Sequence, residues 1–160
     1  MNWDELWMNM VHLIAMKSRD PSSHIGALIV TPDNRLISAG YNGFPRGVEY
    51  EDSKRQERPT KYFYYEHAER NACYLARQSV EGCIMYTSGT PCADCARAII
   101  QSGIKEVVVD AVWDSMTAQD KWTEHAKHTI VMFREAGVKL RAINVKPVQI
   151  SRFFRGKIIE

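Results

Sequence analysis

The sequence predicts an α/β protein with a three-layer α/β/α fold, in which helices cover both faces of a mixed central sheet of about five strands. Two observations carry this prediction. The neighbouring apolar runs 25–30 and 35–41 form a hairpin pattern, and helical and strand patterns then alternate up to residue 145. Hairpin strands pair antiparallel, whereas strands connected through a helix pair in parallel, so one sheet must contain both arrangements.

The first predicted elements are an amphipathic helix and a β-hairpin. Apolar residues recur at helical spacing over residues 3–18, and Asn2 with Glu5 three residues later predicts a capping box at the helix start. The continuous apolar run 25–30 predicts a buried strand, and a turn-forming segment separates it from the strand 35–41. We therefore expect these two strands to form the antiparallel part of the sheet.

Residues 42–61 are polar and highly charged, and they show no clear hydrophobic period. They predict a loop, and a loop of roughly 20 residues inside one domain is usually functional or mobile. A lid over a phosphate or an effector is one interpretation. Interleaved acidic residues favour the other, a solvated loop, for the basic side chains Arg46, Lys54, Arg55 and Arg58.

The rest of the chain alternates between helices and strands. The predicted elements are helix 66–78, strand 82–88, helix 92–102, strand 105–112, helix 118–136 and strand 138–145. A length of 160 residues with 45% hydrophobic residues suits one domain, so we assign 1–160 to a single domain. Residues 146–160 form its C-terminal tail, in which Phe153 and Phe154 could contact a neighbouring subunit or fold back.

Composition limits the classes of function. A formal net charge of +2 gives no general basic surface, so we expect no nucleic-acid partner. No apolar stretch approaches the roughly 18–20 residues of a membrane span. Asp4 and Glu5 interrupt the region where an export signal would be apolar. The Cys-x-x-Cys spacing then favours reduced thiols, and we expect a cytoplasmic protein with no membrane partner.

The motif with the clearest chemistry is His67-Ala68-Glu69, followed by Pro91-Cys92-Ala93-Asp94-Cys95. A histidine and two cysteines are the three soft ligands that a catalytic zinc keeps when its fourth position holds water. His-x-Glu followed by Pro-Cys-x-x-Cys is also the signature of zinc nucleobase deaminases, which the motif resembles. We therefore predict one catalytic zinc ion per chain, held by His67, Cys92 and Cys95.

The spacing sets a geometric condition on this site. If Pro91 opens a helix, Cys92 and Cys95 lie three residues apart on one face and reach one ion together. His67 and Glu69 are two residues apart, so within a helix they would point about 200° away from each other. Both reach one ion only if they lie at the start of a helix.

The residues suggest how such a site would react. Zinc lowers the pKa of bound water toward 7, which supplies hydroxide for attack on an amino-bearing carbon. Glu69 is the carboxylate beside a predicted ligand, and it could carry protons from water to the leaving amine. The alternatives are a closed structural zinc site that recruits Cys73 or Cys83, or a reduced Cys-x-x-Cys with no metal.

Longer segments resemble the cytidine deaminase superfamily, and the similarity covers roughly residues 4–145. His67-Ala68-Glu69-Arg70-Asn71-Ala72 and Ile99-Ile100-Gln101-Ser102-Gly103-Ile104 extend the zinc motifs. Segments Asp20-Pro21-Ser22-Ser23-His24-Ile25-Gly26 and Gly40-Tyr41-Asn42-Gly43 are similar to the deoxycytidylate deaminase branch. Arg70, where an apolar residue is usual, departs from the family pattern, as does His24, where glutamine is common.

The resemblance implies the three-layer fold and hydrolytic deamination of dCMP to dUMP and ammonia, by attack of zinc-bound hydroxide on C4. Glu69 would be the proton shuttle. Asn42 would contact the sugar, and the backbone of Ala68 and of Thr90 would contact the edge of the base. Members of the branch are commonly homo-oligomers, and many are regulated by dCTP and dTTP, which makes these nucleotides candidate effectors.

Two further residues are candidates for substrate contact. Arg19 could hold a 5′-phosphate, or it could complement the C-terminal end of the first helix. Trp113 follows a strand of a doubly covered sheet, where ligand contacts occur, so it could stack on the base or simply pack at the rim.

Other functions stay open at this point. The nearest is deamination of dCTP, a modified cytosine nucleotide, a free nucleoside or base, or an RNA base. A non-catalytic, zinc-stabilised nucleotide-binding protein belongs to a different class, but a purely structural zinc has no use for Glu69.

Overall fold

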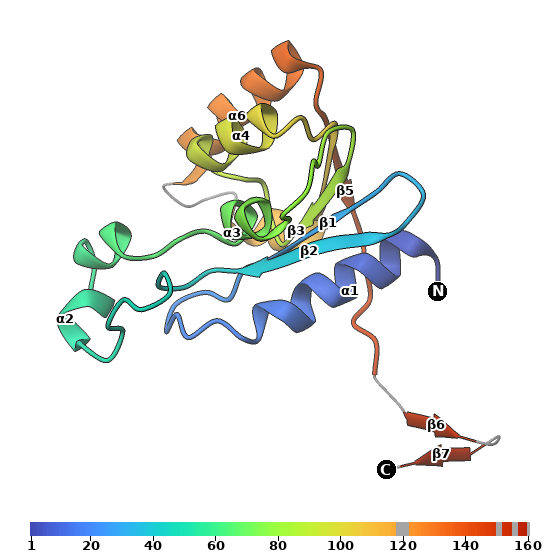
Figure 1. The fold of residues 1–160 in the computed structure, drawn as a ribbon, viewed down its shortest axis with the longest axis horizontal. Coiled ribbons are helices and arrows are strands. Elements are labelled where there is room, and N and C mark those ends of the chain that lie inside the picture. Colours follow the sequence, from blue (N-terminus) through green and yellow to red (C-terminus); the bar gives the residue numbers. More distant parts are fainter. Residues whose placement is uncertain (118–121, 150–151, 155–156, 160) are drawn as a thin grey trace.

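The centre of the molecule is a five-stranded mixed sheet between two layers of helices (Figure 1). The computed structural model describes residues 1–117, 122–149, 152–154 and 157–159. The strand order is β2-β1-β3-β4-β5, which confirms the predicted three-layer fold. The strands are β1 (Gly26–Val30), β2 (Leu36–Tyr41), β3 (Ile84–Thr87), β4 (Glu106–Asp110) and β5 (Lys139–Ile143).

The pairing of the strands brings several chain segments to one edge of the sheet. Strand β1 pairs antiparallel with both β2 and β3, whereas β3, β4 and β5 are parallel. Gly26 is opposite Tyr41, and Ala27 is opposite Thr87. The residues that precede β1 and those that follow β2, β3 and β4 therefore meet at the same edge, which is where ligands bind in sheets of this type.

One face of the sheet is covered by α1 (Trp3–Ala15). The capping box at its start is present as predicted, with Asn2 and Glu5 bonded reciprocally, although the helix ends three residues before the predicted boundary. Its apolar side packs on alternate residues of the sheet. The buried residues of this cluster are Trp7, Met8, Val11, Leu28, Val30, Tyr86 and Val108.

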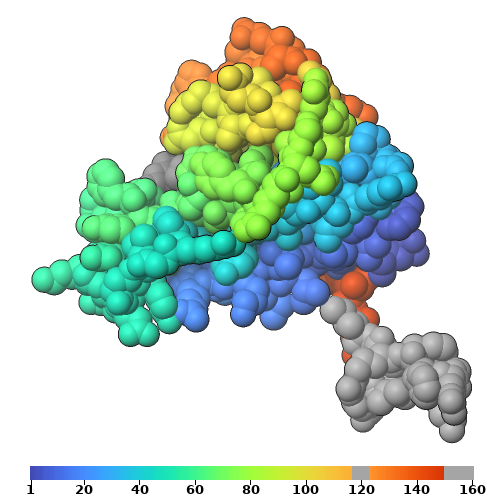
Figure 2. Space-filling model, in the orientation of Figure 1, coloured from blue at the N-terminus to red at the C-terminus, as the bar shows by residue number. Residues whose placement is uncertain are grey.

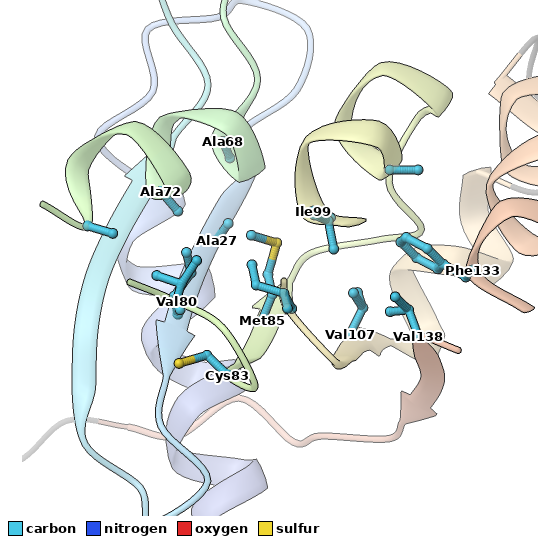
Figure 3. Close-up of a cluster of buried hydrophobic side chains, with 14 of the residues drawn as sticks. Ala27, Ala68, Ala72, Val80, Cys83, Met85, Ile99, Val107, Phe133 and Val138 are labelled. Atoms are coloured by element: carbon cyan, nitrogen blue, oxygen red, sulfur yellow. The ribbon is translucent and has the colours of Figure 1, made fainter. Parts of the chain in front are cut away.

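The opposite face carries α3 (Ala68–Leu75), α4 (Ala93–Gln101) and α6 (Trp122–Ala136). Figure 3 shows side chains of these helices meeting those of the sheet in one apolar cluster. The sheet contributes the other alternate residues of β1, so that both faces of this strand are buried. The labelled members include Ala27, Ala68, Ala72, Met85, Ile99, Val107 and Phe133.

The segment after β2 is more ordered than a plain loop. It contains α2 (Ser53–Gln56) and the 3-10 helix η1 (Thr60–Phe63), which were not predicted because four-residue turns show no period. Phe44 packs against Tyr64 and Tyr65, with ring centroids 5.8 and 4.7 Å apart. The segment protrudes from the body of the molecule on the left of Figure 2.

The chain after β4 also differs from the prediction. Helix α5 (Ala111–Thr117) begins directly after Asp110, whereas we predicted strand to residue 112 and helix only from 118. The Asp110 carboxylate accepts a hydrogen bond from the Val112 N–H at 2.8 Å, which starts the helix within an apolar run. Residues 118–121 lie outside the described part of the chain, and the next helix, α6, begins at Trp122.

The predicted tail contains β6 (Arg152–Phe154) and β7 (Lys157–Ile159), which pair antiparallel. The side chains of Phe153 and Phe154 lie outside what the structure describes, so their predicted contacts stay predictions. Among the described residues, no helix combines the length and the apolar character needed to cross a lipid bilayer.

Gly26 allows α1 to lie directly on β1. A Cβ atom at this position would be 2.1 Å from the Val11 carbonyl oxygen, a backbone atom of α1. We expect Gly26→Ala to lower the free energy of unfolding by about 1–3 kcal/mol, because helix and strand must separate. Denaturant titration measures this, with Gly43→Ala as the control, since a Cβ there meets nothing closer than 3.8 Å. Equal losses in the two variants would contradict the packing argument.

Candidate active site

His67 and Glu69 open helix α3. His67 is the N-cap residue, with extended backbone angles φ −81° and ψ 151°, and Glu69 lies in the first turn with its side chain buried. The histidine side chain therefore leaves the chain before the helical rotation begins. This confirms the geometric condition set by the sequence, under which His67 and Glu69 reach one point only from a helix start.

Cys92 and Cys95 lie in the same way at the start of α4. Cys92 is the N-cap residue and Cys95 is in the first turn. Pro91 precedes the helix instead of opening it, so the predicted helical position of Pro91 is wrong by two residues. The two sulfur atoms nevertheless converge, because an N-cap residue and the third residue of the helix lie on one side.

The histidine and the two cysteines form a compact donor group. His67 Nδ1 lies 3.5 Å from Cys92 Sγ and 3.4 Å from Cys95 Sγ. All three atoms lie within 4.8 Å of one another, and no other group of His, Cys, Asp and Glu in the described ranges is arranged to hold a metal ion. One nitrogen and two sulfurs are the donor atoms that zinc prefers, so the residues fit that ion.

The remaining cysteines are not part of this group. Cys83 is buried in the large apolar cluster, and Cys73 packs against the same cluster. A closed site that uses either of them as a fourth ligand therefore has no support in the structure. Glu69 is closer, with its Oε2 atom 3.6 Å from Cys95 Sγ, and its carboxylate lies beside the donor group.

The electrostatics of the donor group follow from burial and mutual hydrogen bonding. The pKa of Cys92 falls to about 4, first because Cys95 donates a hydrogen bond to it and then because of His67. The same bond, followed by burial, raises the pKa of Cys95. Burial raises the pKa of the Glu69 carboxyl. Burial would lower the pKa of His67, but the Cys92 hydrogen bond and the charge of Glu69 outweigh it and raise it.

Arg70, the departure from the family pattern, lies against the sulfurs. Its Nη1 atom is 3.8 Å from Cys95 Sγ, and its guanidinium pairs with Glu66, which lies four residues earlier, just before α3 begins. A cation at this distance stabilises thiolate charge. Arg70 therefore has a role that an apolar residue could not fill, because its positive charge lies beside the cysteine sulfurs.

A cavity of about 200 Å³ opens beside the donor group at the shared edge of the sheet. Seven of the residues predicted from the sequence to be functional line it, namely Asn42, His67, Ala68, Glu69, Thr90, Cys92 and Trp113. Residues far apart in the chain, from Asp20 to Trp113, thus surround one space. Cys95 lies behind the lining, fully buried.

The polar groups of two predicted contact residues are already engaged. The Asn42 amide oxygen accepts the Ile25 N–H at 2.8 Å, and its Nδ2 donates to the Ser23 carbonyl at 2.9 Å. Thr90 donates its backbone N–H and its hydroxyl to Asp114, at 2.7 and 2.8 Å. A base contact from the Thr90 backbone would therefore use its carbonyl oxygen.

Arg19 lies elsewhere. It is not among the residues that line the cavity, and its guanidinium stacks over the Tyr50 ring, 4.2 Å from the centroid. The basic residues Arg46, Lys54, Arg55 and Arg58 do not line the cavity either. Arg46, Lys54 and Arg58 are exposed, as a solvated loop requires.

Several lining residues were missed by the sequence interpretation. They are Lys61, Tyr62, Tyr65, Ser22, Ser23 and Gly89. Lys61 is the last residue of the segment 42–61, which was predicted as a loop. The available signal was its position at the start of the aromatic run Tyr62-Phe63-Tyr64-Tyr65, directly upstream of His67, of which Tyr64 and Tyr65 pack against Phe44.

The fold and the site together define a zinc-binding deaminase domain, in which a three-donor group, a buried carboxylate and a cavity meet at the edge of an α/β sheet. Comparison with known proteins gives the family. The model of the cytidine and deoxycytidylate deaminase zinc-binding region matches residues 1–111. The chain belongs to the cytidine and deoxycytidylate deaminase family.

Individual relatives agree with this assignment. The chain is 36% identical over 154 residues to deoxycytidylate deaminase of Mus musculus, covering 91% of this chain and 82% of that protein. It is also 36% identical over 138 residues to an uncharacterized deaminase of Aliivibrio fischeri, covering 86% and 91%. The crystal structure of dCMP deaminase from the cyanophage S-TIM5 in complex with dCMP and dUMP matches with a TM-score of 0.66 and 25% identity, covering 88% and 96%.

Proposed function

We propose that this protein hydrolyses dCMP to dUMP and ammonia. The observation that carries the proposal is the buried carboxylate of Glu69 beside the His67, Cys92 and Cys95 donor group, at one side of a cavity. The choice of nucleotide is supported by the mouse relative, a deoxycytidylate deaminase, and by the cyanophage enzyme whose structure holds dCMP and dUMP.

In this proposal His67 Nδ1, Cys92 Sγ and Cys95 Sγ hold one zinc ion per chain. The bound ion would supply Lewis-acid activation of water at neutral pH. The position of Cys92 and Cys95 at the start of α4 favours this role, since a helix N-terminus stabilises the negative charge of a thiolate.

Glu69 carries the protons of the reaction. Its carboxylate takes a proton from water and delivers it to the ring nitrogen N3 of the cytosine. A second proton, from the hydroxyl group formed at C4, passes by the same carboxylate to the amino group there. A C4–O bond forms and the C4–N bond breaks, so that the oxygen of water ends in dUMP and ammonia leaves. Burial favours this exchange, because it raises the pKa of the Glu69 carboxyl and so its capacity to hold a proton.

We propose further that the lining residues orient the nucleotide. Asn42 and the backbone of Ala68 and Thr90 would contact sugar and base. Trp113 would lie against the base at the rim of the cavity. Its ring is held by close packing against Gly89, where an added Cβ would lie 2.7 Å from Trp113 Cδ1.

A substrate panel tests the proposed function. Purified protein should contain about one zinc per chain, and it should release ammonia from dCMP with a higher kcat/KM than from dCTP or deoxycytidine. Ammonia release is measured for each substrate, with and without added dCTP and dTTP. Equal rates with dCMP and deoxycytidine would exclude the mononucleotide as the preferred substrate, and a higher rate with dCTP or a free base would establish the alternative target.

Three expectations, two from the family resemblance and the last from the composition, stay predictions. They are self-association into a homo-oligomer, regulation by dCTP and dTTP, and a cytoplasmic location. The exposed aromatic residues Phe63 and Tyr74 support self-association, since large apolar side chains are often covered in assemblies. None of the four cysteines is in a disulfide, which supports a reducing compartment.

A further inference from the structure

A buried ion pair lies in the wall of the cavity. Lys61, from the end of the charged segment, donates to both carboxylate oxygens of Asp20, at 2.8 and 2.9 Å. The two residues are only 4% and 6% exposed, although they are 41 positions apart in the chain. Lys61 also donates to the Ser22 hydroxyl at 3.4 Å. Such burial of a lysine needs a paired anion, which Asp20 provides.

Asp20 connects this pair to residues that shape the cavity. Its Oδ1 atom accepts the Ser22 N–H at 2.7 Å, and its Oδ2 atom accepts from the Asn42 amide at 3.4 Å. Asn42 in turn holds Ser23 and Ile25 through its own amide group. Ser22, Ser23, Ile25 and Asn42 all line the cavity. The ion pair therefore fixes one wall through a continuous chain of hydrogen bonds.

The charges along this wall matter for an anionic substrate. Among the described residues that line the cavity, Asp20 and Glu69 are the carboxylates and Lys61 is the one lysine or arginine. With Lys61 present, its charge cancels that of Asp20, and this wall of the cavity has no net charge. Without Lys61, the wall would hold an uncompensated carboxylate in a weakly screened environment, where repulsion of a phosphate is strong.

We propose that Lys61 is a positioning residue that acts through Asp20. It orders the wall formed by Ser22, Ser23, Ile25 and Asn42, and it cancels the Asp20 charge, so that the cavity admits a nucleotide 5′-phosphate. This inference rests on the proposed function, because it requires a phosphorylated substrate. In this role Lys61 does not contact the phosphate directly. The ammonium group is already saturated by Asp20 and Ser22.

The first test is Lys61→Met, which keeps much of the side-chain volume and removes the charge. We expect KM for dCMP to rise on the order of 100-fold, with kcat nearly unchanged, because a buried carboxylate loses its partner. The loss with deoxycytidine should be roughly tenfold smaller, since that substrate carries no phosphate to repel. If deoxycytidine turns over too slowly, inhibition by dUMP and by deoxyuridine gives the same comparison.

The deciding variant is the double substitution Lys61→Met with Asp20→Asn. It removes the uncompensated charge, so KM for dCMP should recover by roughly tenfold or more relative to Lys61→Met alone. A lysine that bound the phosphate directly would give no recovery. Lys61→Arg keeps the charge and should remain close to the wild type. If Lys61→Met does not fold, Lys61→Gln, which also removes the charge, replaces it in both the single and the double variant.

Lys54→Met is the matched control, because Lys54 is an exposed lysine of the same charged segment. It should leave KM unchanged. Melting temperatures and zinc content are measured for every variant. A double variant as impaired as Lys61→Met, or parallel losses with dCMP and deoxycytidine, would overturn the role of Lys61. A wild-type protein that releases no ammonia from dCMP would instead overturn the proposed function.

Discussion

Replacing Glu69 by glutamine should abolish deamination while zinc stays bound. The substitution keeps the shape of the side chain but removes its ability to accept and deliver protons, and such groups contribute on the order of 10²–10⁴ in rate. We expect kcat for dCMP to fall at least by this factor. Ammonia release measures the loss, and elemental analysis of zinc in the same sample shows that the metal site is intact.

The structure leaves no second carboxylate for this task in the cavity. The only other carboxylate among its described lining residues is Asp20, whose oxygens are bonded to Lys61. Glu81→Gln is the matched control, because Glu81 is exposed and is not among the lining residues. Glu81→Gln should have wild-type activity. A Glu69→Gln protein that still turned over dCMP at the wild-type rate would show that another group carries the protons.

Replacing Cys95 by serine should remove both zinc and activity. Serine offers a harder and less acidic donor, so the variant loses one of the three proposed ligands at a fully buried position. We expect the zinc content to fall from about one ion per chain to near zero. The melting temperature should fall as well, because an ion that binds only the folded chain stabilises it.

A chelator distinguishes this effect from simple damage to the core. Chelation should lower the melting temperature of the wild type but leave that of Cys95→Ser unchanged, since the variant has no zinc to lose. Cys73→Ser is the matched control on α3, because Cys73 lies outside the donor group and packs against the apolar cluster. It should keep its zinc and its response to the chelator. A chelator-sensitive Cys95→Ser protein would contradict the assignment of this ligand.

The sequence predicted the parts of the fold that depend on local periodicity. Helix α1 and strands β1 and β2 follow from the spacing of apolar residues, and the capping box follows from Asn2 and Glu5. The boundary between β4 and α5 does not, because Ala111 and Val112 continue an apolar run that suits either structure. Only the carboxylate of Asp110, bonded to the Val112 N–H, decides that a helix begins there.

The site was predictable where its residues lie close together in a motif. Each half of the motif lies at one helix start, His67 and Glu69 at that of α3 and Cys92 and Cys95 at that of α4. The spacing in the sequence is therefore enough to predict that the members of each pair act together. The pairing of Lys61 with Asp20 was not predictable, because the two residues are 41 positions apart and share no motif. The aromatic residues after Lys61 indicate that it lies near packed rings, but not which carboxylate it meets.

Strand β4 passes directly into helix α5. The number of residues at this junction therefore matters more for the position of Trp113 and Asp114 than the identity of those residues. With no loop between Asp110 and Ala111, nothing absorbs an inserted residue. One extra residue would rotate the following helix by about 100°. Trp113 would leave the mouth of the cavity, and Asp114 would lose Thr90. We therefore expect that related chains vary in sequence at this junction while the number of residues from Asp110 to Asp114 stays constant.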